Sequence, residues 1–362
     1  MADRRPARLA ALAAAIESAH LDGLLLAGAA NIRYLTGFSG TSALLLVTQR
    51  QAVVVTDFRY ETQVAEEVGE LARVVVERQS LWAGLWRELA GMPGIAVLGF
   101  ESASLVHRDF QRLLEEGSRW QWRPTVGLVE ALRERKDADE IALIRAAAEI
   151  AVRALEETLP QVHVGMTELE VAGSLEHALR RHGSTSFPFP SIVASGPRAA
   201  LPHARTSARR IEAGDFLLMD FGAEVGGYCA DVTRSVVVGR ASDEQRAVYD
   251  VVREANRLAA TGVRAGLSGR DADAIARDYI DRRGFGEAFG HSLGHGIGLE
   301  VHEAPRLART ADAPLAADAV VTIEPGIYRP GWGGVRIEDD VHLAAGGPQI
   351  LTRFPRELLE LG

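Results

Sequence analysis

The sequence predicts a two-domain α+β protein: an N-terminal α/β domain, then a larger domain built from one set of elements used twice. The chain has 362 residues, more than one average domain. Short apolar runs alternate with helical patterns up to about residue 125. Beyond the highly charged segment 130–140, the order helix, helix, polar loop, hairpin appears twice, about 100 residues apart. We therefore expect domains at 1–130 and 131–362, the second with pseudo-two-fold symmetry.

The N-terminal domain alternates strand-like and helix-like segments. The basic, Ala-rich start has apolar residues at helical spacing and predicts a first helix ending near Asp22, not a targeting peptide. The domain contains neither a glycine-rich phosphate loop nor an acid/base cluster, so we expect it to serve capping or dimerisation. Strands are expected in 21–28, 41–48, 51–58 and 95–100, and helices in 60–69, 80–89 and 108–116.

Helix starts in the second domain carry a local signature. An Asp, Thr or Ser is followed three residues later by Glu or Gln, which is the capping box. The pairs are Asp137 with Glu140, Thr167 with Glu170, and Ser242 with Gln245. They predict helices over about 137–159, 167–183 and 242–262, and a fourth helical pattern covers about 271–284.

Composition excludes several classes of protein. The net charge of −9 argues against a nucleic-acid partner, and no run of about 18 apolar residues predicts a membrane span. Cys229 is the single cysteine, so no intramolecular disulfide can form, and we expect a reducing, cytoplasmic setting. Cys229 lies two residues before Asp231 and either approaches a bound metal or is a small packed side chain, the more common case.

The segment 215–239 predicts a β-hairpin with one carboxylate in each arm. Apolar, β-branched runs flank Val225 and the two glycines that follow it. A turn centred between Val225 and Gly226 places Asp220 directly opposite Asp231, with Cβ atoms about 5 Å apart. Like charges in this position destabilise a sheet, so the arrangement indicates a cation between them.

A second hairpin, over 319–343, repeats this arrangement. Glu324 and Glu338 are equidistant from Gly331, which lies in a Pro/Gly-rich turn. Four carboxylates can surround two divalent ions, as in aminopeptidases and phosphatases. His295 is the natural fifth ligand, because it lies between two glycines and three histidines fall within 291–302. Such an oxygen-rich set suits Mn²⁺, Fe²⁺ or Co²⁺, and Zn²⁺ would also bind.

These motifs resemble the pita-bread metallopeptidases, which include methionine aminopeptidase, aminopeptidase P and prolidase. The N-terminal stretches 31–37 and 57–60 resemble the Xaa-Pro branch, which has a creatinase-like N-terminal domain that methionine aminopeptidases lack. The motifs of the second domain are Asp220-Phe221-Gly222, Asp231-Val232-Thr233-Arg234, Gly294-His295-Gly296-Ile297-Gly298, Val301-His302-Glu303, Ile323-Glu324-Pro325-Gly326 and Arg336-Ile337-Glu338-Asp339.

The resemblance implies two divalent metal ions per subunit, Mn²⁺ first, with Co²⁺, Zn²⁺ or Fe²⁺ as alternatives. Asp220 would bind one ion, Asp231 and Glu338 would bridge both, and His295 and Glu324 would hold the other. The implied reaction is hydrolysis of the bond between an N-terminal residue and proline by a metal-bridged hydroxide. The implied substrates are short Xaa-Pro peptides, and dimers are usual in the family.

The resemblance also assigns roles around the metals. His203 and His302 would lie beside the substrate, and His291 would line the site. Glu324 or Glu338 would shuttle the proton to the leaving nitrogen. Arg336 would orient Glu338 or a substrate carboxylate, or would form a plain salt bridge. Phe189 lies where Xaa-Pro relatives often have an aromatic residue against proline, although the run Phe187-Pro188-Phe189-Pro190 departs from their pattern.

Other functions stay open at the level of sequence. Dipeptidase and aminopeptidase P share the same catalytic set, and the sequence does not separate them. Arg59 and Tyr60 are either structural or reach a neighbouring subunit's cleft. A creatinase-like non-peptidase hydrolase and a non-catalytic pita-bread binding protein are the alternatives, and the complete metal set argues against both.

Overall fold

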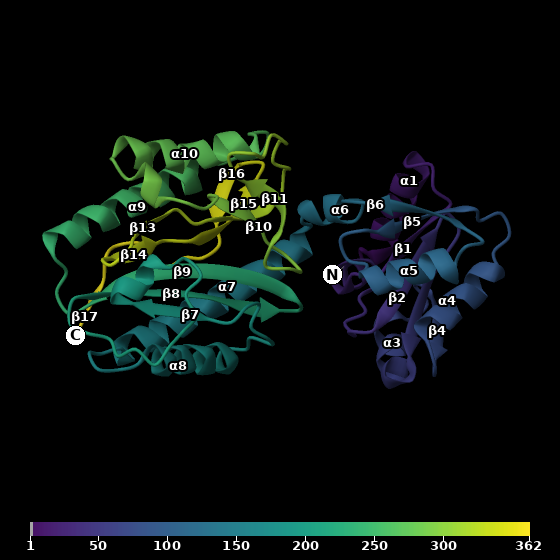
Figure 1. The fold of residues 1–362 in the computed structure, drawn as a ribbon, viewed down its shortest axis with the longest axis horizontal. Coiled ribbons are helices and arrows are strands. Elements are labelled where there is room, and N and C mark those ends of the chain that lie inside the picture. Colours follow the sequence, from purple (N-terminus) through teal and green to yellow (C-terminus); the bar gives the residue numbers. More distant parts are fainter. Residues whose placement is uncertain (1–2) are drawn as a thin grey trace. The chain divides into compact units, whose positions relative to one another are not determined.

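A computed structural model describes residues 3–362, which form two compact units. The first unit ends at Arg133, and the second runs from Glu134 to Gly362. Both units mix helices and sheets, as the α+β prediction requires (Figure 1). No helix within residues 3–362 has the length and apolar character needed to cross a membrane.

The first unit contains a six-stranded sheet with the order β4-β3-β2-β1-β5-β6. Strands β1, β2 and β3 pair antiparallel, and β4, β5 and β6 are added in parallel. The strands are β1 (Gly23–Leu26), β2 (Ala43–Thr48), β3 (Ala52–Asp57), β4 (Arg73–Glu77), β5 (Val97–Glu101) and β6 (Gln121–Thr125). The helices are α1 (Arg5–Ser18), α2 (Ala29–Thr36), α3 (Glu61–Val68), α4 (Leu81–Ala90), α5 (His107–Glu115) and α6 (Glu130–Glu134).

Helix α2 and strands β4 and β6 lie outside the sequence predictions. The N-cap residue of α2 is Gly28, which offers no capping side chain, so the local start signal is missing. Long-range contacts hold this helix instead. The buried Asn31 donates its amide to Glu101, and Glu101 also accepts from the backbone N–H of Gly28.

The second unit contains the predicted repeat of helix pair and hairpin. Helices α7 (Ala138–Thr158) and α8 (Glu168–Arg181) precede the hairpin β8 (Asp215–Val225) and β9 (Tyr228–Val238). Helices α9 (Asp243–Gly262) and α10 (Gly269–Arg282) precede the second set of strands. The remaining strands are β7 (Ile192–Ser195), β10 (Gly294–Gly296), β11 (Glu303–Leu307), β12 (Val320–Ile323), β13 (Gly326–Arg329), β14 (Gly333–Arg336), β15 (Asp339–Ala344), β16 (Gly347–Ile350) and β17 (Glu360–Leu361).

Within this unit the strands lie between two helix pairs. In Figure 1, α7 and α8 cover one side of the β7–β8–β9 sheet, and α9 and α10 lie over the strands of the second half. Strands β14 and β15 contact β8 and β9, so the two hairpins meet in the interior. The capping boxes at Asp137, Thr167 and Ser242 are all present at the starts of α7, α8 and α9.

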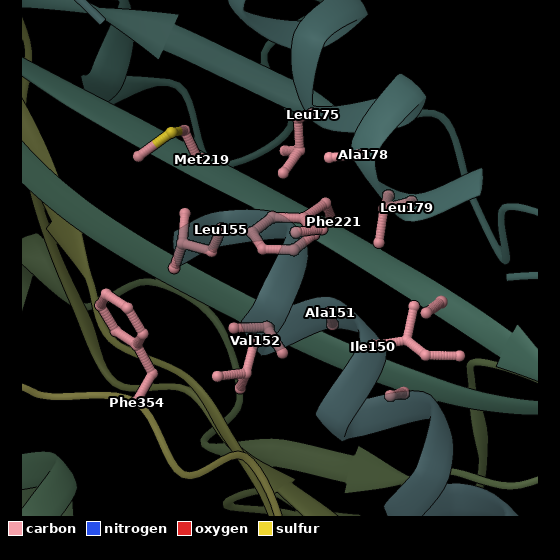
Figure 2. Close-up of a cluster of buried hydrophobic side chains, with 14 of the residues drawn as sticks. Ile150, Ala151, Val152, Leu155, Leu175, Ala178, Leu179, Met219, Phe221 and Phe354 are labelled. Carbon is pink, nitrogen blue, oxygen red and sulfur yellow. The ribbon is translucent and has the colours of Figure 1, made fainter. Parts of the chain in front are cut away.

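Alternation along β8 assigns its two faces. Met219 and Phe221 point into a buried cluster with Leu155 of α7 and Leu175 of α8 (Figure 2). Leu218 and Asp220 occupy the alternate positions of β8 and therefore point the other way, toward the second half of the unit. Burying a side chain of this size contributes about 2 kcal/mol, so the apolar face fixes which face carries the carboxylates.

Candidate metal centre

The first hairpin places two carboxylates on one face of the sheet. The prediction that they lie directly opposite each other is wrong, because Asp220 pairs with Thr233 and Asp231 pairs with Gly222. The turn consists of Gly226–Gly227, both with positive φ (57° and 84°), as a two-residue type I′ turn requires. The turn centre therefore lies one residue later than expected, and the two aspartates are diagonal neighbours on the same face.

The second hairpin holds Glu324 and Glu338 at a break between its two ladders. Strand β12 pairs with β15 and β13 pairs with β14 in one continuous antiparallel register, and this register places Glu324 opposite Glu338, as predicted. The backbone at the break is joined by the N–H of Ile337, which donates to the carbonyl of Pro325 at 3.4 Å. Pro325 has no N–H to donate, so the ladder opens where the two glutamates occur.

His295 enters the same space from β10. A Cβ on Gly294 would lie 2.0 Å from the Thr322 carbonyl oxygen, and one on Gly296 would lie 2.0 Å from that of Ala304. Only glycines allow this approach of three strands around the histidine. The Nδ1 atom of His295 is 3.0 Å from the Gly296 carbonyl oxygen and donates to it, so Nε2 carries the free lone pair.

The carboxylates converge on this Nε2 atom. Ligand atoms of Asp231, His295 and Glu338 all lie within 4.8 Å of one another. The Nε2 atom of His295 is 3.4 Å from Glu324 Oε1 and 4.0 Å from Asp231 Oδ2. Asp220 lies on the same sheet face as Asp231, and its charge raises the pKa of Asp231 and of Glu338 beyond the effect of burial.

The electrostatics of the group fit divalent cations. Burial raises the pKa of Asp231 and of Glu338 well above their usual range, and repulsion among the carboxylates adds to it. Burial also raises the pKa of Glu324 to about 8, although Arg336 opposes the shift. Buried oxygens Oδ1 of Asp220 and of Asp231 accept no hydrogen bond from the described residues. Burial lowers the pKa of His295 to about 4, so its imidazole is neutral near pH 7. The histidine therefore does not neutralise the four acidic groups around it, and a bound cation would.

Arg336 is the cation that the protein itself supplies. The residue is 3% exposed, and its Nη2 atom donates to Asp220 Oδ2 at 2.5 Å. Its Nε atom donates to Thr233 Oγ1 at 3.1 Å, and the same hydroxyl donates to Glu338 Oε2 at 2.5 Å. Arg336 thus contacts one candidate ligand directly and another through Thr233, which fixes both carboxylates in place.

His291 is held by hydrogen bonds at both ring nitrogens. Its Nδ1 atom is 2.8 Å from the Ser292 carbonyl oxygen, and its Nε2 atom is 2.9 Å from the Tyr328 hydroxyl. That hydroxyl accepts from Arg336 at 2.8 Å, so it donates to His291. Burial lowers the pKa of His291 to about 4, and the ring reaches Glu324 only at 4.0 Å. The structure therefore places His291 at the wall of the site, behind Glu324.

His203 and His302 are exposed, in contrast to His295. The rings of His295 and His302 meet edge to face with centroids 4.4 Å apart. Partial burial lowers the pKa of His302, and the neighbouring His203 lowers it further, so the two histidines lie near each other. Phe189 lies over the first hairpin, since a Cβ on Gly222, the ladder partner of Asp231, would be 3.2 Å from its ring.

Three polar side chains near the ligands were given no role in the predictions. Thr233 could have been found, because it lies two residues after Asp231 and so shares its sheet face. Tyr328 and Asp340 carry no comparable local signal. The carboxylate of Asp340 accepts from the backbone N–H of Asp231 at 3.0 Å, and Tyr328 links Arg336 to His291. Cys229 belongs to the same buried cluster as Leu155 and Leu175, where burial raises the pKa of its thiol.

The sequence was also compared with known families. Residues 142–345 match metallopeptidase family M24, and residues 8–135 match the creatinase/prolidase N-terminal domain. The chain belongs to metallopeptidase family M24. This confirms the resemblance stated from the motifs and the pita-bread fold, and membership of this family implies that the chain binds divalent metal ions.

Solved structures of similar proteins superpose on nearly the whole chain. An Xaa-Pro dipeptidase from Bacillus anthracis is 42% identical, with a TM-score of 0.95, covering 99% of this chain and 100% of that one. An X-Pro aminopeptidase from Thermotoga maritima is 37% identical, with a TM-score of 0.89, over 97% and 98% of the two chains. Among curated relatives, an Xaa-Pro dipeptidase of Pyrococcus horikoshii is 35% identical over 94% of this chain and 95% of its own length.

Proposed function

We propose that this protein hydrolyses the peptide bond between an N-terminal residue and proline in short peptides, using divalent metal ions. The observation that carries the proposal is the convergence of Asp231, His295 and Glu338, with Glu324 and Asp220 beside them. Its M24 relatives with known structures include an Xaa-Pro dipeptidase and an X-Pro aminopeptidase. The alternatives of a creatinase-like hydrolase and a non-catalytic binding protein are disfavoured, because neither needs this complete set of ligands.

We further propose two ions, Mn²⁺ first, held by Asp220, Asp231, His295, Glu324 and Glu338. When bound, such ions polarise the scissile carbonyl and lower the pKa of a coordinated water. The oxygen-rich set suits Mn²⁺, Fe²⁺ or Co²⁺, and Zn²⁺ competes by general affinity. The orphaned oxygens of the two aspartates are positions where an ion would replace the missing hydrogen-bond donors.

The surrounding residues would handle substrate and protons. His302 and His203 are exposed at the edge of the ligand set, where an imidazole N–H can stabilise a developing oxyanion. Glu324 would deliver the proton to the leaving proline nitrogen. Phe189 offers the apolar ring against which proline would pack. Arg336 would position Asp220 directly and Glu338 through Thr233, and His291 would line the wall of the site.

A substrate panel tests this proposal. The purified protein, loaded with Mn²⁺, is assayed on Ala-Pro, Met-Pro, Ala-Pro-Gly, Met-Ala and a tetrapeptide with proline second. We expect release of the first residue wherever proline is second, and no release from Met-Ala. Cleavage of Met-Ala without cleavage of Met-Pro would overturn the proline assignment, and inactivity on every peptide with bound metal present would favour a binding protein.

His302→Ala should lower kcat for Ala-Pro on the order of a hundredfold, because it removes a donor at the developing oxyanion. Metal content measured by elemental analysis should stay at the parent level, since the His302 ring is exposed and packs against His295 edge-on. His177→Ala, on the exposed side of α8, is the matched control. Loss of an ion from His302→Ala would instead make His302 a ligand.

Arg306 supports dipeptides as the preferred substrates. It is exposed and pairs with His295 in the β10–β11 ladder, so both side chains project from the same face. Burial lowers the pKa of His295 and of His302, and the positive charge of Arg306 lowers each further, which places the guanidinium near both rings. A free carboxylate one residue beyond the scissile bond is the natural partner for this cation.

Arg306→Met should therefore raise KM for Ala-Pro about tenfold and leave KM for Ala-Pro-Gly nearly unchanged. The reason is that only the dipeptide carries its carboxylate on the proline. Steady-state kinetics on both peptides measure the effect, and Arg282→Met at the end of α10 serves as control. An equal change in KM for both peptides would show that Arg306 does not recognise the carboxylate of the dipeptide.

The proposal also covers the role of the first unit and the oligomeric state of the protein. We propose domains 1–130 and 131–362, with the first serving capping or dimerisation, and a homodimer in a reducing cytoplasmic setting. The single cysteine supports the setting, and the family resemblance supports the dimer. Light scattering of the purified protein measures the oligomeric state, and a monomer at working concentrations would contradict the assembly.

A further inference from the structure

A buried ion pair lies beside His302, outside the ligand set. Lys136 Nζ is 2.5 Å from Glu303 Oε1, and the two side chains are only 1% and 5% exposed. Glu303 follows His302 directly in the chain, whereas Lys136 is 167 positions away in sequence. Both charges are removed from water at this point, which is unfavourable unless the geometry of the pair compensates.

The carboxylate of Glu303 also closes the loop that carries His302. A Cβ on Gly298 would lie 2.4 Å from Glu303 Oε1, so the two ends of the segment 298–303 are in contact. The N–H of Gly298 donates to the Glu300 carbonyl at 3.1 Å, and the Gly298 carbonyl accepts from the N–H of Cys229 at 2.8 Å. The loop is thus fastened to β9 at one end and to Lys136 at the other.

Strand β11 shows why this fastening matters for His302. Glu303 is the first residue of β11 and pairs with Gly296, but the register then shifts, and His295 pairs with Arg306. His302 lies immediately before the strand, so its position follows that of Glu303. Its ring nevertheless makes a defined contact, 4.4 Å from the ring of His295.

We propose that Lys136 is a positioning residue for His302: its ammonium holds the Glu303 carboxylate inside the protein and thereby fixes the His302 ring over the metal centre. The inference rests on the proposed function, because it assumes that His302 contacts substrate. Lys136 is the second residue after Glu134, where the catalytic unit begins, so the first turn of this unit helps to build its active site.

Without the ammonium, the buried Glu303 carboxylate would lose the charged partner 2.5 Å away and would be held less firmly inside the protein. Because His302 is its direct neighbour, the imidazole would move with it. A displacement of about 1 Å at a catalytic group can cost on the order of a hundredfold in rate. Lys136→Met should therefore lower kcat for Ala-Pro about tenfold to a hundredfold, with KM and metal content nearly unchanged.

Two further variants separate the pair from general stability. In Lys136→Met/Glu303→Gln both charges are gone, so the loop should return inward and turnover should recover at least partly. Arg181→Met removes a cation paired with Glu157 on the surface of the same unit and should behave like the parent protein. Hydrogen exchange of residues 296–307 should be faster in Lys136→Met than in the parent, while exchange in α9 stays the same.

The deciding measurement adds Lys136→Met to His302→Ala. If Lys136 acts through His302, the double variant should have the same kcat as His302→Ala alone. Both proteins are assayed well below their melting temperatures, so that unfolding does not affect the comparison. An equal loss in both backgrounds, or parent turnover in Lys136→Met alone, would overturn the proposal. Failure of the proposed function is distinct, because the parent protein itself would then release nothing from Ala-Pro.

Discussion

Asp231→Asn is expected to abolish hydrolysis of Ala-Pro, lowering kcat/KM on the order of a thousandfold or more. Metal ions at such sites contribute several kcal/mol to the transition state, and about 4 kcal/mol corresponds to this factor. Asp231 lies in the group formed with His295 and Glu338, and its Oδ1 accepts no hydrogen bond from residues 3–362. An amide replaces one of these oxygens with an N–H₂ donor and removes the negative charge.

Metal content should fall together with activity, because Asp231 is one of the residues that we propose to hold the ions. Elemental analysis after loading with Mn²⁺ and desalting measures it, and we expect less than one ion per subunit. Asp278→Asn makes the same chemical change on the exposed side of α10 and should keep parental activity and metal content. An Asp231→Asn protein with two ions and parental turnover would remove Asp231 from the site.

Removal of the metal should lower the free energy of unfolding of the second unit. This decrease should grow as the pH rises from about 6.5 to about 8. Burial raises the pKa of Glu324 to about 8, and it raises the pKa of Asp231 and Glu338 well above their usual range. A carboxyl with a raised folded-state pKa stabilises the fold while it stays protonated. This contribution is lost as pH rises through the folded-state value, by about 1.4 kcal/mol per pH unit for each proton.

The lower limit of this window comes from the histidines. Burial lowers the pKa of His291 and of His295 to about 4, so both disfavour folding as pH falls below about 6.5. Between pH 6.5 and 8 these histidines are mostly neutral in both states, and carboxyl groups with raised pKa values set the pH dependence. Bound cations keep these carboxylates ionised in the fold, so the metal-loaded protein should show a much flatter pH dependence.

Urea unfolding with a chelator or with Mn²⁺, at pH 6.5 and pH 8, measures the effect. Glu338→Gln is the informative variant: without metal it should be more stable than the parent at pH 8, because one of the repelling charges is gone. The same variant should gain little from Mn²⁺. Burial also raises the pKa of Glu101 in the first unit, but that contribution is equal with and without metal and cancels in the difference. Equal stability with chelator and with Mn²⁺ would contradict a metal centre.

Local signals predicted the frame of the catalytic unit well. The capping boxes at Asp137, Thr167 and Ser242 each begin a helix, because side chain and backbone N–H are only three residues apart. The register that places Glu324 opposite Glu338 followed from the turn at Gly331. The same reasoning was wrong by one residue at Gly226–Gly227, where both glycines with positive φ form the turn itself.

The sequence by itself determined the order of elements, the acidic residues of both hairpins and the glycines around His295, because these depend on neighbours in the chain. Only the tertiary structure decided which oxygens and nitrogens meet. Arg336 reaches Asp220 across 116 positions and Lys136 reaches Glu303 across 167, and no local pattern encodes such pairs. Their geometry arises when distant segments of the second unit pack together, because burial makes an unpaired charge costly and these ions find their partners far along the chain.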